Sequence, residues 1–415
     1  MSDPTFGISI TRIDNEPRPP VWSDMSVVGI IGTAPDADAA VFPADDPVFL
    51  YSDDAAKLTA LGDAGTLKDA LVLLNAQLGE FQVAAKVVLV RVEDGVDAAA
   101  TIANVVGDGA LTGLSAFLRA GPEIGMIPRL LCAPGFTGQR TGAEANPVSA
   151  ALPPICEKLL AHAVVEGPAT TEQDAIDWRE TISSSRLIPV DPAVKVYAEG
   201  VSVVQPASPA IIGIGVRRDH EKQGRPFHSW ANQPVQGIVG PSRPINFSLT
   251  DGATEGQRLL SANVGVILRG EMGVESAIGQ GGFIFVGTDN AGEDDLWRFY
   301  NVTRGRDFIH LMLLRTLRFY LGRFNVTGQT IQAILNTMET GLRNLKADGD
   351  ILGFELKFTR DQNTPEELRQ GRFTVSFAAE EAPVLRYLGI QSARYRPALD
   401  ALLDDLLAQV GTITG

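Results

Sequence analysis

The chain has 415 residues, of which 45% are hydrophobic, with a formal net charge of −15 at pH 7 and a pI of about 4.8. This length predicts two or three domains, and the composition is typical of a folded protein rather than a disordered one. The acidic balance argues against nucleic-acid binding and against adsorption to anionic membranes, which both need basic patches, and a gain in solubility is its simplest interpretation.

The first predicted element is a strand that has no hairpin partner near it in the sequence. Prolines at 17, 19 and 20 follow it and favour a stiff, extended spacer. Because an isolated strand exposes unpaired N–H and C=O groups, we expect it to be donated to another subunit. The apolar side chains of this expected arm are Phe6, Ile8, Ile10 and Ile13.

The start of the chain and its apolar runs also bear on location. No basic region followed by an apolar stretch opens the sequence, so we expect no secretory signal. No run of about 18 apolar residues occurs, so we expect no membrane span and expect the chain to fold in a cytoplasm. Cys132 and Cys156 have no spacing that demands a disulfide, and we favour two free, buried thiols over a pair.

Strand and helix signals alternate between about residues 25 and 200, which predicts an α/β layered domain with much parallel pairing. Near-continuous apolar runs indicate buried strands at 27–31, 48–51, 87–92, 129–132, 163–165 and 186–189. Helical spacing and end signals predict helices at 66–79, 97–106, 147–161 and 172–183. Thr66 and Asp97 are the expected caps of the first two helices, and Gly107 is expected to end the second.

The middle of the chain is less regular. Residues 206–222 fit a helix in part, but Gly213 and Gly215 weaken that prediction. The stretch 224–244 is rich in Gly, Pro, Asn and Ser and predicts a long loop. We therefore expect a domain boundary near residue 243.

The last third predicts a mixture of strands and long helices, so the expected fold class is α/β in the first half and α+β overall. Strands are expected at 264–268 and 283–288, helices at 296–320, 329–346 and 397–409, and a further strand candidate at 384–388. A long hairpin is expected from 351–359 and 372–379. Its apolar side chains are Phe354, Leu356, Phe358, Phe373, Val375 and Phe377.

No credible active site emerges from the sequence. The stretch around Gly213 and Gly215 has Arg where a dinucleotide loop needs its third glycine, and the stretch 29–33 lacks the lysine of a phosphate loop. The four histidines show no metal-ligand spacing, and no Gly-x-Ser-x-Gly elbow occurs. We therefore expect no catalytic residue, no cofactor and no metal site.

One charged cluster stands out on the expected helix 296–320. Arg304, Arg315 and Arg318 lie within about 60° of each other on a helical wheel. A basic stripe on an acidic chain suits an acidic partner, while a solvated face or internal ion pairs fit the pattern equally well.

Seven stretches, none distinctive alone, occur in an order that points to one family. They are 26–38, 42–48, 65–67, 90–95, 128–135, 296–304 and the hairpin 351–379. In this order the chain resembles the tail sheath proteins of contractile-tailed bacteriophages, which are related to the sheaths of R-type pyocins and type VI secretion systems. The resemblance covers essentially the full length.

The resemblance implies a hollow helical cylinder of sixfold rings that surrounds a tail tube and contracts to drive the tube through the host envelope. It implies an N-terminal arm and linker at 1–24, an outer domain at 25–243, an inner, tube-facing domain at 244–382 and a C-terminal arm with a helix at 383–415. The arms of two neighbours would add strands to hairpin 351–379 of a third subunit. The C-terminal arm would include Leu385, Tyr387 and Ile390.

The resemblance also implies partners and a location. The implied partners are other copies of the chain, the tail tube protein, the baseplate proteins and the tail terminator proteins. The arginine stripe is the candidate contact with the tube. The implied location is a virion that is assembled in host cytoplasm. No cofactor, nucleic acid or membrane insertion is implied. A static tail or baseplate protein is the first alternative, and a nucleotide-binding α/β enzyme is the second.

Overall fold

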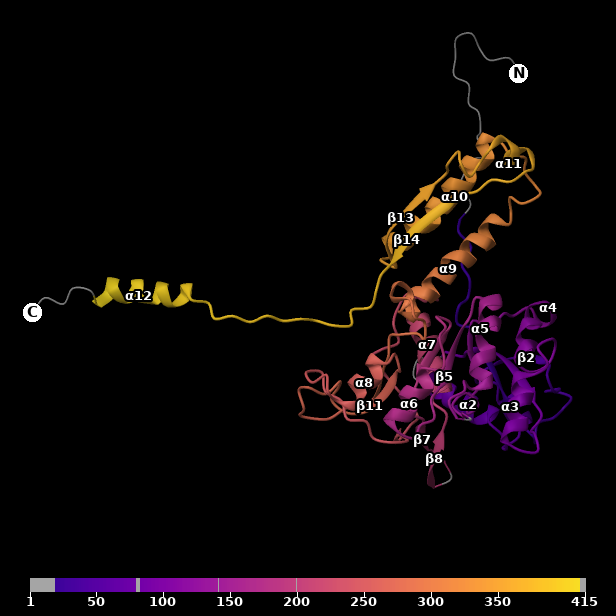
Figure 1. The fold of residues 1–415 in the computed structure, drawn as a ribbon, viewed down its shortest axis with the longest axis horizontal. Helices are drawn as coiled ribbons and strands as arrows, with labels where there is room; N and C mark the ends of the chain where they lie inside the picture. Colours follow the sequence, from indigo (N-terminus) through magenta and orange to yellow (C-terminus); the bar gives the residue numbers. More distant parts are fainter. Residues whose placement is uncertain (1–18, 80–82, 141, 199, 411–415) are drawn as a thin grey trace, which may run out of the picture. The chain divides into compact units, whose positions relative to one another are not determined.

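The computed structural model describes residues 19–79, 83–140, 142–198 and 200–410 (Figure 1). It divides into two compact units, Met1–Val384 and Leu385–Gly415, which are described separately. The expected N-terminal arm, with Phe6, Ile8, Ile10 and Ile13, lies outside the described residues.

The first unit is built around a twisted sheet that has six strands in the described part of the chain, in the order β2-β3-β1-β4-β5-β6. All neighbouring strands are parallel except β2, which runs antiparallel to β3. The strands are β1 (Val28–Thr33), β2 (Pro47–Tyr51), β3 (Lys86–Val92), β4 (Leu130–Cys132), β5 (His162–Glu166) and β6 (Leu187–Val190). The prediction of a largely parallel α/β layer is confirmed.

Helices cover both faces of this sheet, which is why its strands are apolar on both sides (Figure 1). On one face lie α2 (Leu67–Ala76) and α7 (Ser208–Glu221). On the other lie α3 (Ala98–Val106), η2 (Gly113–Leu118), α4 (Ala120–Ile124), α5 (Pro147–Leu159) and α6 (Glu172–Arg179). The short α1 (Ala55–Ala60) follows β2. Cys132 and Cys156 are free and buried in these two layers, as expected.

Local signals account for the ends of helix α3 but not for the start of α2. Asp97 accepts a hydrogen bond from the Ala100 N–H at 2.7 Å, and Gly107 ends α3 at φ 75°. Thr66 does not cap α2 with its side chain, because its hydroxyl accepts from the Thr33 N–H at 3.2 Å instead. The Thr66 hydroxyl thus ties the start of α2 to the end of β1.

The ambiguous stretch 206–222 is the regular helix α7, and its glycines are explained by close packing. A Cβ at Gly213 would lie 2.7 Å from Gln77 Cγ, and one at Gly215 would lie 2.6 Å from Trp230 Cζ2. Glycine lowers helix propensity but allows these side chains to touch the helix backbone. Tertiary contacts therefore outweigh the local preference.

Two smaller sheets of the described chain follow, in the orders β10-β7-β8 and β11-β12-β9. Their strands, with helix α8, are β7 (Val194–Ala198), β8 (Val201–Gln205), β9 (Gln233–Pro234), β10 (Gly240–Pro241), α8 (Glu255–Ser261), β11 (Val266–Arg269) and β12 (Phe283–Val286). The expected long loop 224–244 thus contains two short strands. Because β12 pairs with β9, the packing does not break at the expected boundary near residue 243.

A helical layer and a hairpin complete the first unit. They comprise η3 (Asp295–Trp297), α9 (Tyr300–Leu317), α10 (Gly328–Ala347), β13 (Ile351–Lys357), α11 (Pro365–Arg369) and β14 (Ser376–Glu381). Helix α9 starts later than expected because the backbone of Phe299 forms a bridge with Asp289. The hairpin packs on α9 and α10 through a separate apolar cluster.

The expected second hairpin strand, 372–379, begins only at Ser376. The side chain of Asn363 takes both backbone groups of Thr374, accepting from its N–H at 2.7 Å and donating to its C=O at 2.9 Å. These bonds replace ladder bonds, so Phe373 and Val375 precede β14, and Phe358 follows β13. Only the other three apolar residues of the expected hairpin, Phe354, Leu356 and Phe377, stand in its strands.

The second unit contains α12 (Pro397–Val410), close to its expected bounds. Residues 385–396 have neither helix nor strand in the single chain, so the strand expected at 384–388 is not formed there. Leu385, Tyr387 and Ile390 are exposed. Within the described ranges, no helix combines the length and the hydropathy that a bilayer crossing requires.

Candidate functional site

A buried ion pair joins the helical layer to the α/β layer. Arg304 on α9 contacts Asp219 on α7 through both nitrogens, with Nη1 3.1 Å from Oδ1 and Nη2 2.6 Å from Oδ2. Both side chains are excluded from solvent. Ser26 Oγ donates to Asp219 Oδ2 at 3.1 Å, and Arg304 Nη2 lies 3.4 Å from the Met25 C=O. Three segments therefore meet at one pair of opposite charges: the linker before β1, α7 and α9.

Aromatic side chains enclose the Arg304–Asp219 ion pair, which we call the joint. The Arg304 guanidinium lies 4.9 Å from the centre of the Trp230 ring, a cation–π distance. The Tyr300 hydroxyl accepts from the Trp230 N–H at 2.8 Å and donates to the Gly287 C=O at 2.9 Å. Burial raises the pKa of Tyr300 to about 12, so the hydroxyl keeps its proton. The low-polarity surroundings strengthen the ion pair they surround.

This geometry corrects one expectation about the arginine stripe. Arg304 is fully buried and paired, so it is not a surface contact, and the alternative of an internal ion pair holds for this residue. Arg315 is half-buried and donates to the Trp22 C=O at 3.0 Å, while Arg318 is exposed. The stripe is therefore divided between an internal joint and a surface at the end of α9.

A second polar contact lies further along α9. Arg186 donates to Asp307 Oδ2 and, at 2.9 Å, to Glu157 Oε1. His162 Nε2 is 3.0 Å from the Thr303 hydroxyl, and the ring is fully buried. Burial, together with the nearby Arg186 and Arg304 cations, lowers the pKa of His162 well below its ordinary value. The imidazole is therefore neutral at physiological pH.

The β13–β14 hairpin presents one packed face and two free edges. Phe354, Leu356 and Phe377 turn toward the apolar cluster of α9 and α10. Arg306 fixes the end of β14 by donating to Glu381 Oε1 and to the Ala379 C=O, both at 2.6 Å. In the described part of the chain each strand pairs only with the other, so each keeps an outer edge of unpaired backbone groups. Such edges can accept a further strand.

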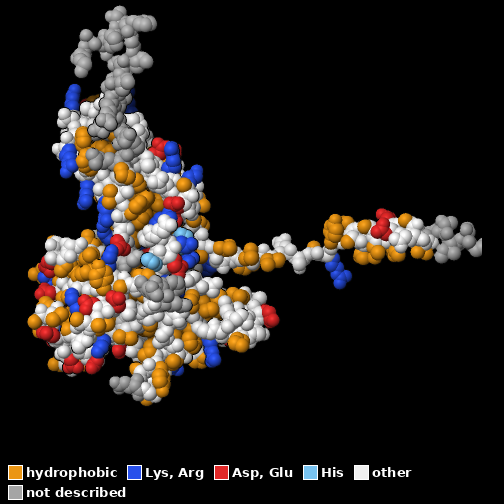
Figure 2. All heavy atoms as spheres, turned by 180° about the vertical axis from the view of Figure 1, so that it is seen from behind, with side chains coloured by type: hydrophobic (Ala, Val, Ile, Leu, Met, Phe, Trp, Pro, Cys, Tyr) orange, Lys and Arg blue, Asp and Glu red, His pale blue; other side chains and the backbone are white. Residues whose placement is uncertain are grey.

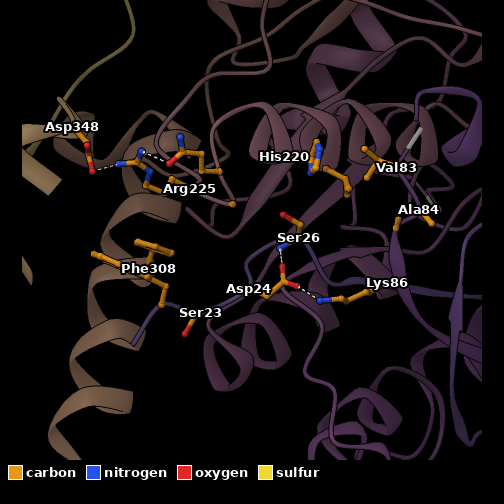
Figure 3. Close-up of a pocket in the computed structure, with 15 residues that line it drawn as sticks. Ser23, Asp24, Ser26, Val83, Ala84, Lys86, His220, Arg225, Phe308 and Asp348 are labelled. Carbon is orange, nitrogen blue, oxygen red and sulfur yellow. Dashed lines mark hydrogen bonds and ion pairs between the residues drawn. The ribbon is translucent and has the colours of Figure 1, made fainter. Parts of the chain in front are cut away.

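A cavity of about 540 Å³ lies beside the joint, between the linker, α7, α9 and α10 (Figure 3). Its charged walls are already paired: Asp24 with Lys86 at 2.8 Å, and Arg225 with Asp348. Over the described ranges, no group of three or more His, Cys, Asp and Glu side chains could hold a metal ion. The ion pairs of Asp24 and Arg225 therefore connect segments that line the cavity.

The carboxyl edge of the sheet is where a doubly wound fold would hold a nucleotide. Here Glu166, at the end of β5, is buried and points at the start of α7. Its Oε1 accepts from the Ser208 N–H at 2.7 Å and its Oε2 from the Gly135 N–H at 2.9 Å. A carboxyl group of the chain thus takes the position at a helix N-terminus that would suit a phosphate. At the start of α7, the position that a bound phosphate would need is therefore taken by Glu166.

Comparison with known proteins gives one consistent answer. No family model matches the chain. It is 27% identical over 372 residues to a putative prophage major tail sheath protein of Pseudomonas aeruginosa (strain UCBPP-PA14), covering 88% of this chain and 90% of the relative. It is 26% identical over 402 residues to the tail sheath protein of Escherichia phage P2, covering 94% and 96%.

Solved structures agree on the fold. The sheath complex of an extracellular contractile injection system (PVC) in the contracted state matches with a TM-score of 0.67 at 14% identity, over 96% of this chain and 99% of that chain. The contracted helical sheath of the anti-feeding prophage (AFP) matches with a TM-score of 0.66 at 16% identity, over 95% and 100%. The resemblance to contractile tail sheath proteins is confirmed, and so is the mixed α/β fold.

We expect the ion pair at the joint to dominate the stability of the first unit. Changing Arg304→Met leaves the Asp219 carboxylate buried without its opposite charge, with only the Ser26 hydroxyl bonded to it, and should lower the free energy of unfolding by about 3–5 kcal/mol. The double change Arg304→Met with Asp219→Leu should recover much of this loss. Urea unfolding followed by tryptophan fluorescence measures both, with Arg318→Met as the exposed control. A loss as small as that of the control would refute the role of the pair.

His162 should make the stability depend on pH. Its pKa is lowered in the folded chain, so between that pKa and about 6.5 only the unfolded chain binds the proton. The free energy of unfolding should therefore fall as pH drops below about 6.5, by up to about 1.4 kcal/mol per pH unit. His162→Gln should reduce this slope, the rest of which comes from His228 and His310, whose pKa values are also lowered by burial. His220→Gln, on the exposed end of α7, should keep the slope. Equal slopes in the wild type and H162Q would contradict the assignment.

Proposed function

We propose that this chain is a structural subunit of a contractile phage tail sheath that polymerises into a helical cylinder of sixfold rings around a tail tube. The observation that supports it best is the collinear similarity to the phage P2 tail sheath protein over 94% of this chain and 96% of that relative. The match of the fold to contracted sheath structures is consistent with this role. The subunit is not an enzyme and needs no cofactor.

The subunits are linked by exchanged strands. Residues 6–13 form the N-terminal arm, and Leu385, Tyr387 and Ile390 belong to the C-terminal arm. Both arms add to the free edges of hairpin 351–379 on a third copy. The outer edges of β13 and β14, which pair with no other strand of the described chain, and the exposed apolar side chains after residue 384 support this arrangement.

Contraction is a rotation of whole subunits. The main-chain hydrogen bonds of the arms persist while the linkers at 14–24 and 385–396 absorb the change in direction. The extended sheath is kinetically trapped, and the contracted sheath buries more surface between subunits, so the energy is stored at assembly. The outer part of the subunit precedes the inner part in the chain. Because β12 pairs with β9 across the boundary expected at residue 243, we place the start of the inner part at α9 and not at residue 244.

The remaining partners follow from the sheath role. The inner part faces the tail tube, and the ends of the cylinder contact the baseplate and the tail terminator. Host cytoplasm is the place of assembly and the virion tail the final location. One observation favours a second candidate, a static baseplate component: a match with a TM-score of 0.64 comes from a structure of the anti-feeding prophage baseplate. Long striated cylinders of the purified chain, seen by electron microscopy, would separate the sheath from this candidate.

Deleting residues 1–15 should leave a folded subunit that cannot polymerise. We expect the deletion to remove the donated strand and to leave in place the buried apolar residues of the described chain, which begin at Met25. Circular dichroism and urea unfolding should match those of the full chain, while negative-stain microscopy should find no sheaths. The matched control is the deletion of residues 2–4, which precede the arm. Normal sheaths from the chain without residues 1–15 would refute the arm assignment.

A further inference from the structure

Three arginines at the end of α9 form an unpaired cationic surface, which we call the Arg patch: Arg315, Arg318 and Arg323. Among the described residues, none of the three has a carboxylate oxygen within ion-pair distance, although the chain carries a net charge of −15. The Arg323 guanidinium lies 4.9 Å from the centre of the Phe319 ring, which holds it at the surface. Unpaired cations on an acidic chain favour an acidic partner.

The Arg patch borders an apolar hollow. The hollow has a volume of about 580 Å³, and its other walls are Pro19, Val21, Thr316 and Phe319. Four large apolar side chains in the same stretch of the chain are exposed: Leu314, Leu321, Phe324 and Val326. Blue and orange side chains lie side by side over this part of the first unit in Figure 2. A hollow of this kind fits an amphipathic helix with acidic margins.

Helix α12 has the complementary chemistry. Its apolar side chains follow an i, i+3, i+4, i+7 spacing, which places them on one stripe, and each is between 46% and 67% exposed. They are Leu399, Leu402, Leu403, Leu406, Leu407 and Val410. The same spacing sets Asp400 and Asp404 along one margin of the stripe and Asp405 along the other. The helix contains no Lys or Arg, so its charge is purely negative.

We propose that α12 of one copy docks its leucine stripe on the apolar hollow of a second copy, with its aspartates facing the Arg patch. The inference rests on the proposed function, which supplies identical copies in contact. The 12 residues of 385–396 can span up to about 40 Å, enough to reach another subunit. The docked helix anchors the end of the C-terminal arm beyond any donated strand. In this arrangement the Arg patch contacts another copy of this chain and not the tail tube.

Charge reversal on each side tests this docking in the full chain. The patch variant is Arg318→Glu with Arg323→Glu, and the helix variant is Asp400→Arg with Asp404→Arg. Each should lower the fraction of chain that sediments as sheath at least tenfold, because like charges then face each other. A chain with all four changes should recover to within twofold of the wild type. The control Arg343→Glu with Lys346→Glu makes the same charge change on exposed positions of α10 and should assemble normally.

A mixture of the patch variant and the helix variant separates docking between copies from docking within one chain. In an equal mixture each helix finds an opposite charge only on the other kind of copy, so at least half of the wild-type assembly should return. Recovery in the four-change chain but not in the mixture would mean that α12 binds its own chain, and would overturn the proposal. No recovery in either would assign the Arg patch to another partner, such as the tail tube, and would also overturn it. Normal assembly of both variants would overturn it as well, while the sheath role would still stand on the arm deletion.

Discussion

The bonds between Arg304 and Asp219 are the constraint on which the rest of the first unit depends. They are the place where the linker before β1, the helix that covers the sheet and the helix that carries the hairpin are held in one arrangement. An ion pair without access to water is stable only while its geometry is complete, so it allows little independent motion of α7 and α9. A force applied at the hairpin is therefore transmitted to the α/β layer.

The spacing of apolar residues and the end signals in the sequence were enough to predict the parallel strands and helix α3. The parallel strands are apolar runs, and α3 has its cap and its final glycine where the sequence has them. The predictions that failed concern segments whose structure depends on side chains outside the segment itself. Residues 206–222 could not be assigned because the side chains that need the glycines, Gln77 and Trp230, come from elsewhere, and the late start of β14 depends on Asn363.

The arginines of α9 show the same limit for the candidate site. A helical wheel correctly groups Arg304, Arg315 and Arg318, but it cannot tell which end of the stripe is covered. Burial of Arg304 depends on Asp219, which is 85 residues away in the sequence. The family resemblance was predictable because it rests on the order of many weak stretches, whereas residue roles rest on single contacts. The proposed strand exchange would add contacts that one chain does not contain.

The position of Glu166 affects how the stability of the α/β layer responds to dilution. Many doubly wound domains lose stability when they are diluted away from their nucleotide, because the ligand contributes to folding by mass action. Here the group at the start of α7 is covalently part of the chain, so its local concentration never changes. The contact that fills the start of α7 therefore cannot be lost by dilution, and this layer of the fold needs no dissolved ligand to complete it.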